Sequence, residues 1–137
     1  MTMNPVVHFE FPVEDHARAS KFYAEAFGWE AHQMGPEMGN YTVVHTSETD
    51  DNNMIKEPGR INGGFFTKSP DNTVPGVVIA VDDIEEAKKK VIAAGGTIVG
   101  ASKGPDSIDD IPGIGKYVSI RDTEGNRVAL LQPNPQM

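Results

Sequence analysis

The sequence predicts an α+β fold in which two tandem βαβββ units form a curved mixed β-sheet cleft with the helices on the outside. Two observations predict it. The residue pattern alternates between the two-residue period of strands and the 3.6-residue spacing of helices, in the same order in both halves. The second half also repeats the first at a fixed shift. We therefore expect a single domain over residues 1–137, made of modules at about 5–67 and 74–133.

The composition limits the available chemistry. The chain has no cysteine, so disulfides, thiolate metal sites and cysteine nucleophiles are excluded, and a metal would need His, Asp or Glu ligands. The net charge of -8 argues against nucleic acid or an anionic membrane as a partner, because both need clustered Lys and Arg. The N-terminal residues lack the pattern of a signal peptide or membrane span, which predicts a cytoplasmic protein.

The first half begins with a strand. Residues 6–13 alternate with period two, so Phe9 and Phe11 fall on one face and His8 and Glu10 on the other. The first face is expected to pack in the core and the second to face a ligand.

A helix is expected directly after this strand. Apolar residues recur at helical spacing over residues 16–27, Asp15 suits the N-cap and Gly28 the C-cap. Trp29 is expected in the core, whereas His16 is expected at the surface. A polar loop at 47–58 and three short strands at 29–34, 41–46 and 61–67 complete this half.

The second half follows the same plan. Its helix has an Asp83 N-cap with Glu86 three residues on, and it ends near Ala94 before a pair of glycines. The expected strands and loops are a strand at 77–81, a strand from Thr97, a long loop at 100–115, and two final strands at 117–121 and 127–132 around a turn at 122–125.

The repeat relates the halves residue by residue. A shift of 68 residues aligns Val13 with Val81, Asp15 with Asp83, Ala19 with Ala87, Tyr23 with Val91 and Gly28 with Gly96. With a gap for unequal loops, Tyr41 pairs with Tyr117 and Gly64 with Ala129. A unit of about 65 residues cannot bury both faces of its sheet, so the inner faces should line a concavity that binds a ligand.

These motifs resemble the vicinal oxygen chelate superfamily, which comprises glyoxalase I, extradiol dioxygenases, fosfomycin-modifying enzymes, epimerases and bleomycin-sequestering proteins. The motifs lie at residues 6–8, 13–15, 21–23, 27–29, 80–83, 94–96 and 122–126 and so cover essentially the whole chain. The Gly63-Gly64 pair and residues 111–117 resemble the glyoxalase-like branch most. The resemblance implies a fold and a homodimer, which could exchange units between chains, but no single reaction.

The resemblance also implies four metal-ligand positions, at the first and last strands of each unit. They are His8, Gly64, Gly76 and Ala129, and of these only His8 has a side chain able to bind a metal. A catalytic divalent site needs about three protein ligands. We therefore expect no metal and no other cofactor. A site formed by His8, Glu10 and His45 stays open as an alternative.

The predicted catalytic residues are His8 and Glu10, as acid/base or ligand-contacting groups. The alternatives are a structural hydrogen bond for His8 and an ion pair of Glu10 with Arg121 or Arg127. The residues expected to line the cleft are Tyr41, His45, Phe66, Val78, Tyr117, Ser119, Arg121 and Leu131.

Such a lining suits a small, partly apolar organic molecule. The sequence thus predicts a small-molecule-binding protein with a metal-free cleft. The alternative is a glyoxalase-like enzyme, a lyase or dioxygenase, that either depends on a metal or uses Glu10 or His8 as acid/base.

Overall fold

The computed structural model describes residues 3–52 and 54–134, in which the chain folds into two compact units. The first unit spans His8–Pro75. The second starts at Gly76 and also includes the N-terminal residues up to Val7. Each unit has its own helix and its own buried core.

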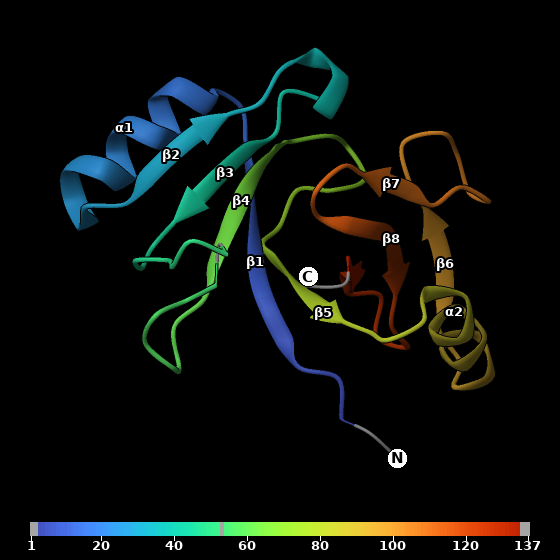
Figure 1. Ribbon diagram of the computed structural model, residues 1–137. Coiled ribbons are helices and arrows are strands. Elements are labelled where there is room, and N and C mark those ends of the chain that lie inside the picture. Colours follow the sequence, from blue (N-terminus) through green and yellow to red (C-terminus); the bar gives the residue numbers. More distant parts are fainter. Residues whose placement is uncertain (1–2, 53, 135–137) are drawn as a thin grey trace. The chain divides into compact units, whose positions relative to one another are not determined.

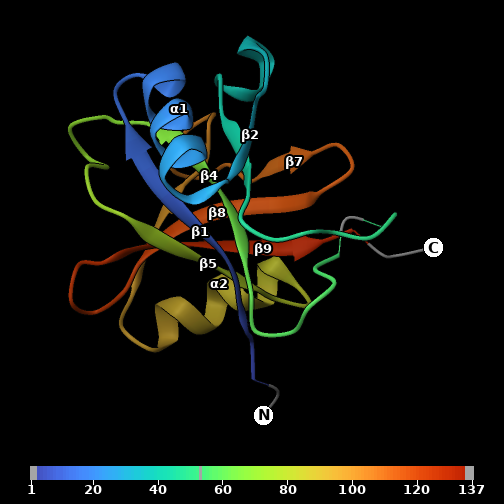
Figure 2. The ribbon, with the colours of Figure 1, turned by 90° about the vertical axis from the view of Figure 1, so that its left-hand side faces the viewer.

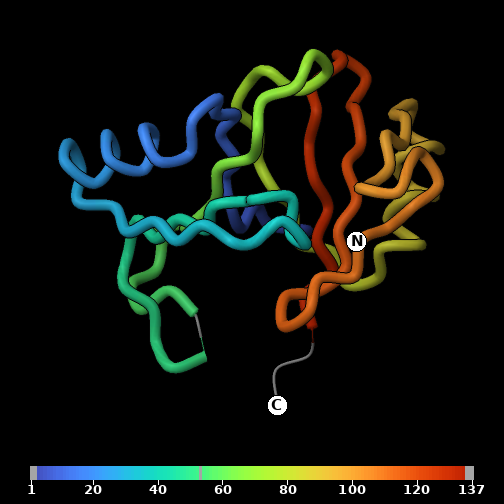
Figure 3. Tube along the Cα trace, turned by 90° about the horizontal axis from the view of Figure 1, so that it is seen from above, coloured from blue at the N-terminus to red at the C-terminus, as the bar shows by residue number. Residues whose placement is uncertain are grey.

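The first unit has the order strand, helix, strand, strand, strand (Figure 1). Its elements are β1 (Val6–Val13, of which the first two residues belong to the second unit), α1 (His16–Phe27), β2 (Glu30–Gln33), the short 3-10 helix η1 (Pro36–Met38), β3 (Thr42–His45) and β4 (Asn62–Thr67). The strands lie in the order β2-β3-β4-β1, with β1 and β4 parallel and the other neighbours antiparallel. The described parts of the long connection between β3 and β4, on either side of residue 53, match the predicted polar loop (Figure 3).

The helix α1 begins and ends where the sequence predicts. The Asp15 side chain accepts a hydrogen bond from the Arg18 backbone N–H at 2.9 Å, which satisfies one of the free donors of the first turn. Gly28 ends the helix with a φ of 74°, a left-handed conformation that glycine adopts without strain.

One face of the first sheet packs against α1, which crosses β1 and β4 in Figure 2. Val13, Val44 and Phe65 are buried there, and Phe65 is fully inaccessible to solvent. Tyr23 and Trp29 stack with ring centroids 4.6 Å apart. The core of this unit is therefore aromatic, and we call the opposite face of β1, β3 and β4 the far face.

The second unit repeats this plan with one additional strand. Its elements are β5 (Gly76–Ala80), α2 (Ile84–Ala93), β6 (Thr97–Gly100), β7 (Asp109–Ile111), β8 (Gly115–Arg121) and β9 (Arg127–Pro133). The strands lie in the order β5-β9-β8-β6, with β5 and β9 parallel, and β7 pairs with β8.

The prediction of an unbroken loop over residues 100–115 is wrong. Asp109–Ile111 forms β7, which makes a tight hairpin with β8. The Ile114 N–H donates to the Ile111 carbonyl at 3.0 Å, and Gly113 takes a φ of 77° between them. Pro112 and the glycines suggested a loop, but they form only the turn of this hairpin.

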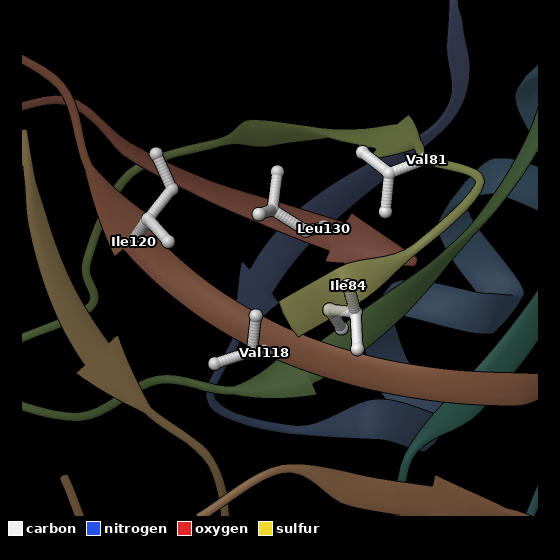
Figure 4. Packing of buried hydrophobic residues seen from close by; sticks show 5 residues of the cluster. All are labelled: Val81, Ile84, Val118, Ile120 and Leu130. Carbon is white, nitrogen blue, oxygen red and sulfur yellow. The ribbon is translucent and has the colours of Figure 1, made fainter. Parts of the chain in front are cut away.

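The core of the second unit is aliphatic (Figure 4). Ile84, from the first turn of α2, meets Val118 of β8 and Leu130 of β9, and all three are at most 4% exposed. Asp83 caps α2 by accepting hydrogen bonds from the N–H groups of Glu85 and Glu86. Among the described residues, no helix is long and apolar enough to cross a membrane.

Strand register shows the repeat directly. In the first unit Gly64 lies opposite Glu10 on one side and Val43 on the other. In the second unit Ala129 lies opposite Val78 and Ser119, which are the equivalents of Glu10 and Val43. The predicted α+β class with two βαβββ units is confirmed.

Candidate functional site

The far face of the first unit carries the predicted acid/base residues. Parallel pairing places His8 beside Asn62 and Glu10 beside Gly64. The antiparallel register of β3 with β4 is recorded as far as Val44 opposite Gly63, and its extension by one residue brings His45 to the other side of Asn62. Because directly paired residues share a face, His8, Asn62 and His45 form one row, which we call the donor row.

Glu10 lies two residues further along β1. Its side chain is buried, with 9% of the residue exposed, and its Oε2 accepts a hydrogen bond from the Tyr41 hydroxyl at 2.9 Å. The hydrogen bond joins two residues that the sequence predicts separately for the site. A buried carboxylate held by a phenol is a pair that can bind a polar group or exchange a proton with one.

Gly64 makes room for this pair. A Cβ atom at residue 64 would overlap the hydroxyl and ring carbons of Tyr41. On the other face, a Cβ at Gly63 would overlap the carbonyl and ring of Phe9. The two glycines therefore let an aromatic ring approach β4 from each side, and the Tyr41 phenol takes the space of a side chain at residue 64.

His8 is half-buried, and loss of hydration lowers its pKa below the ordinary value of 6.5. The imidazole is therefore mostly neutral at neutral pH, with one N–H donor and one bare nitrogen. His45, also partly buried, ends β3 at the other side of the donor row.

The lowered pKa of His8 predicts weaker folding in acid. Burial also lowers the pKa of His16, against the opposing charge of Asp15. Between the pKa of each histidine in the unfolded chain and its lower pKa in the folded chain, the unfolded chain binds more protons. The free energy of unfolding is therefore highest above the unfolded-chain pKa, and it decreases as the pH falls through the folded-chain pKa. We expect a lower melting temperature at about pH 5.5 than at about pH 7.5, with a smaller drop in His8→Gln. His32→Gln, on the exposed strand β2, is the control, and an equal drop in both variants would contradict this role of His8.

Asn62 is a site residue that the sequence reasoning missed. Its Oδ1 accepts hydrogen bonds from the backbone N–H groups of Thr46 at 2.8 Å and Ser47 at 3.1 Å. Asn62 begins β4, and only the parallel pairing of β1 with β4 brings it beside His8. Asn62 could have been found from the sequence by pairing the first strand of the unit with its last strand in the correct register.

His16, expected at the surface, links α1 to two strands. Its Nδ1 lies 2.7 Å from Thr42 Oγ1 and its Nε2 lies 2.9 Å from Thr67 Oγ1. Thr42 is fully buried, so the imidazole satisfies a hydroxyl that water cannot reach. His16 has a structural role in the first turn of α1.

The second unit holds the other predicted lining residues. Val78 and Leu131 form a buried apolar cluster with Ala129, against which Tyr117 and Val7 pack. Ser119, 4% exposed, lies beside Ala129 in the next strand. Arg121 ends β8, and its Nη1 donates to the Gly125 carbonyl at 2.9 Å in the following turn.

The structure thus places the ten predicted residues in two sets. In the first unit Glu10 and Tyr41 meet, while His8 and His45 flank Asn62 and Phe66 lies beyond Gly64 on β4. In the second unit the aliphatic residues and Tyr117 form one cluster. That both sets line a single cleft stays a prediction.

A metal does not fit the residues present. Within residues 3–52 and 54–134, no three His, Cys, Asp or Glu side chains gather closely enough to hold an ion, so His8, Glu10 and His45 do not form such a site. Two of the positions implied by the resemblance, Gly64 and Ala129, are covered by Tyr41 and by apolar side chains. We assign no step to a metal.

Comparison with known proteins supports the predicted fold. Residues 6–47 match the family model for the bleomycin resistance protein-like N-terminal region. No curated protein matches the chain in sequence.

Solved structures share the fold over almost the whole chain. Methylmalonyl-CoA epimerase from Mycobacterium tuberculosis has a TM-score of 0.64 at 14% identity, over 95% of this chain and 88% of that one. A hypothetical protein from Bacillus halodurans C-125 has a TM-score of 0.66 at 14% identity, over 99% of both chains. A glyoxalase/bleomycin resistance protein/dioxygenase superfamily member from Vibrio splendidus 12B01 has a TM-score of 0.59 at 15% identity, over 96% and 100%.

The resemblance to the vicinal oxygen chelate superfamily is confirmed by these matches. The family model covers the first strand, helix and hairpin of the first unit, and the shared fold covers both units. Because the identities are low and one neighbour is an epimerase, the comparisons establish a fold and not a reaction.

Proposed function

We propose that this protein binds a small organic molecule without a metal ion, on the far face of the first unit. One observation carries this proposal. The Tyr41 hydroxyl takes the space over Gly64 and hydrogen-bonds to the buried Glu10, so a protein pair stands where a metal carboxylate would otherwise project. Binding then depends on hydrogen bonds from this pair and on apolar contact.

The chemistry of the face supports a ligand that is polar at one end. The donor row lies on one side of Glu10 along the strands, and Phe66 and Pro12 are paired on the other side. A polar group near Glu10 and an apolar group against Phe66 would both be satisfied. The epimerase of the same fold acts on a coenzyme A ester, by its name, which is also a partly polar organic molecule.

A metal-free acid/base enzyme is the second candidate. A reaction that removes a proton from carbon and returns it needs an acid/base group, and a buried carboxylate with a phenol partner has the groups for such a transfer. Turnover separates the two candidates, because a binding protein leaves its ligand unchanged. We also propose that the protein is a homodimer and is located in the cytoplasm, as expected from the sequence. Light scattering of the purified protein tests the homodimer.

Metal analysis and a ligand screen test the proposal together. Protein purified without chelator is analysed for metal and titrated with zinc, nickel, manganese and iron, and we expect no stoichiometric uptake. A thermal-shift screen of small organic molecules should find compounds that raise the melting temperature, because a ligand of the native state stabilises it by mass action. The stabilisation should disappear in Glu10→Gln and Tyr41→Phe but not in Glu30→Gln, on exposed β2. Tight metal uptake that is lost in His8→Ala would overturn the metal-free proposal.

A further inference from the structure

We infer that the donor row, centred on Asn62, binds a carbonyl or carboxylate oxygen of the ligand. The inference rests on the proposed function, since it assigns the polar end of a molecule bound to the same face. It adds to that function one binding residue, Asn62, and the chemical group of the ligand that this residue would bind. The functional groups of the three side chains, their burial and their spacing from Glu10 lead to it.

Two hydrogen bonds from the backbone fix the orientation of the Asn62 side-chain amide. Two backbone N–H groups, from Thr46 and Ser47, point at the same side-chain atom. Only the amide oxygen can accept them, so the NH₂ group must occupy the other position. This NH₂ has no hydrogen-bond acceptor among the residues that the structure describes. Asn62 is only partly buried, so a ligand can reach it.

The two histidines reinforce the same preference. His8 is mostly neutral at neutral pH because burial lowers its pKa, so it offers one N–H. Neither His8 nor His45 has a hydrogen-bond partner within the described part of the chain. Three partly buried side chains with unused N–H groups therefore lie in one row across β1, β4 and β3. An oxygen with two lone pairs is the complementary partner.

The Asn62 amide offers no acceptor to a cation. Both lone pairs of the Asn62 oxygen are used by backbone N–H groups, so the amide presents only donors outward. Glu10 lies two residues from His8 along β1, a backbone separation of about 7 Å.

Asn62→Asp isolates the NH₂ group. The carboxylate still accepts from Thr46 and Ser47, so the local fold is kept, but both N–H donors are replaced by a negative oxygen. Asn62→Ala would instead leave two backbone N–H groups without an acceptor and weaken folding by about 1–3 kcal/mol, which makes it unsuitable. Asn72→Asp, in the same unit, adds the same charge away from the row and is the matched control.

The experiment uses proton–nitrogen correlation NMR of the isotope-labelled full chain. The Asn62 NH₂ signals are those that vanish in Asn62→Asp. The probes are phenylacetate and phenylacetamide, which separate a carboxylate from a neutral carbonyl, and phenylethylamine, which has the same ring but only a donor. We expect one or both oxygen-bearing probes to shift the Asn62 NH₂ signals saturably, and phenylethylamine to leave them unchanged.

The variants give the decisive comparison. Asn62→Asp should raise the Kd of the bound probe at least about tenfold, whereas Asn72→Asp should leave it unchanged. If the probes shift backbone signals of Glu10 and Val43 with equal Kd in Asn62→Asp, the donor row is wrong and the proposed function stands. If no probe shifts any far-face signal, the donor row is also wrong, and the thermal-shift screen alone then decides the proposed function.

Discussion

Gly64→Ala is expected to displace the Tyr41 ring and lower the free energy of unfolding by about 3 kcal/mol. The added methyl group overlaps the hydroxyl and ring of Tyr41, so the ring must leave the sheet. Glu10, which is buried, then loses the hydrogen bond from that hydroxyl. Urea denaturation followed by tryptophan fluorescence measures the loss, because Trp29 lies in the core of the same unit.

Two further variants separate this cause from a general effect of alanine in a strand. Gly76→Ala is the control, since the nearest atom to its new Cβ, the Arg127 carbonyl oxygen, is 3.0 Å away, a much milder contact than the overlap at residue 64, and its cost should be smaller. In the double variant Tyr41→Ala with Gly64→Ala, the losses should be clearly less than additive, because the overlap is already gone. Strict additivity would show that Tyr41 does not occupy the space over Gly64.

The same geometry explains why a metal carboxylate is hard to restore. A glutamate at residue 64 would meet the Tyr41 ring before it reached the far face. An attempt to graft the metal ligands of the superfamily therefore has to replace Tyr41 as well.

Hydrophobic periodicity predicted most of the fold. The period-two pattern of β1 put Phe9 and Phe11 in the core and Glu10 on the far face, as the structure has them. The internal shift predicted which residues are equivalent, and strand register shows the same equivalence at Gly64 and Ala129. These features could be predicted because the alternation of apolar and polar residues is visible within the sequence of a single strand.

The missed features depend on contacts between strands that are distant in sequence. Asn62 enters the site only because β4 pairs with β1 in parallel, and the Tyr41 ring covers Gly64 only because a glycine there leaves room. His16 looked like a surface residue because its partners, Thr42 and Thr67, come from two other strands. Side-chain pairing of this kind has no local pattern in the sequence.

The equivalent positions of the two units have diverged in polarity. Glu10 corresponds to Val78 and Gly64 to Ala129, so a hydrogen-bonded acid in one unit is matched by a buried aliphatic pair in the other. The polar chemistry proposed for this protein is therefore confined to the first unit. The two equivalent positions of the second unit are apolar, which predicts an asymmetric response to substitution.

Ala129→Glu is expected to lower the free energy of unfolding by about 4 kcal/mol at neutral pH. Ala129 is 3% exposed and packs with Val78 and Leu131, so the new carboxylate would stand among apolar side chains instead of in water. Burial favours the protonated acid, and protonating a glutamate at pH 7 costs about 4 kcal/mol, which sets an upper limit to the charge contribution. Thermal and urea denaturation measure the loss.

Ala129→Gln separates charge from size, because it has nearly the same volume and no charge. It should cost less than Ala129→Glu at neutral pH, by the free energy needed to neutralise the acid. The difference should shrink as the pH falls, since the unfolded chain then also binds the proton and protonating the folded acid no longer costs free energy. Equal stability of the two variants at every pH would mean that water reaches residue 129, and the apolar assignment of the second unit would then be wrong. Added zinc should not rescue Ala129→Glu, because the neighbouring side chains Val78 and Leu131 supply no second ligand.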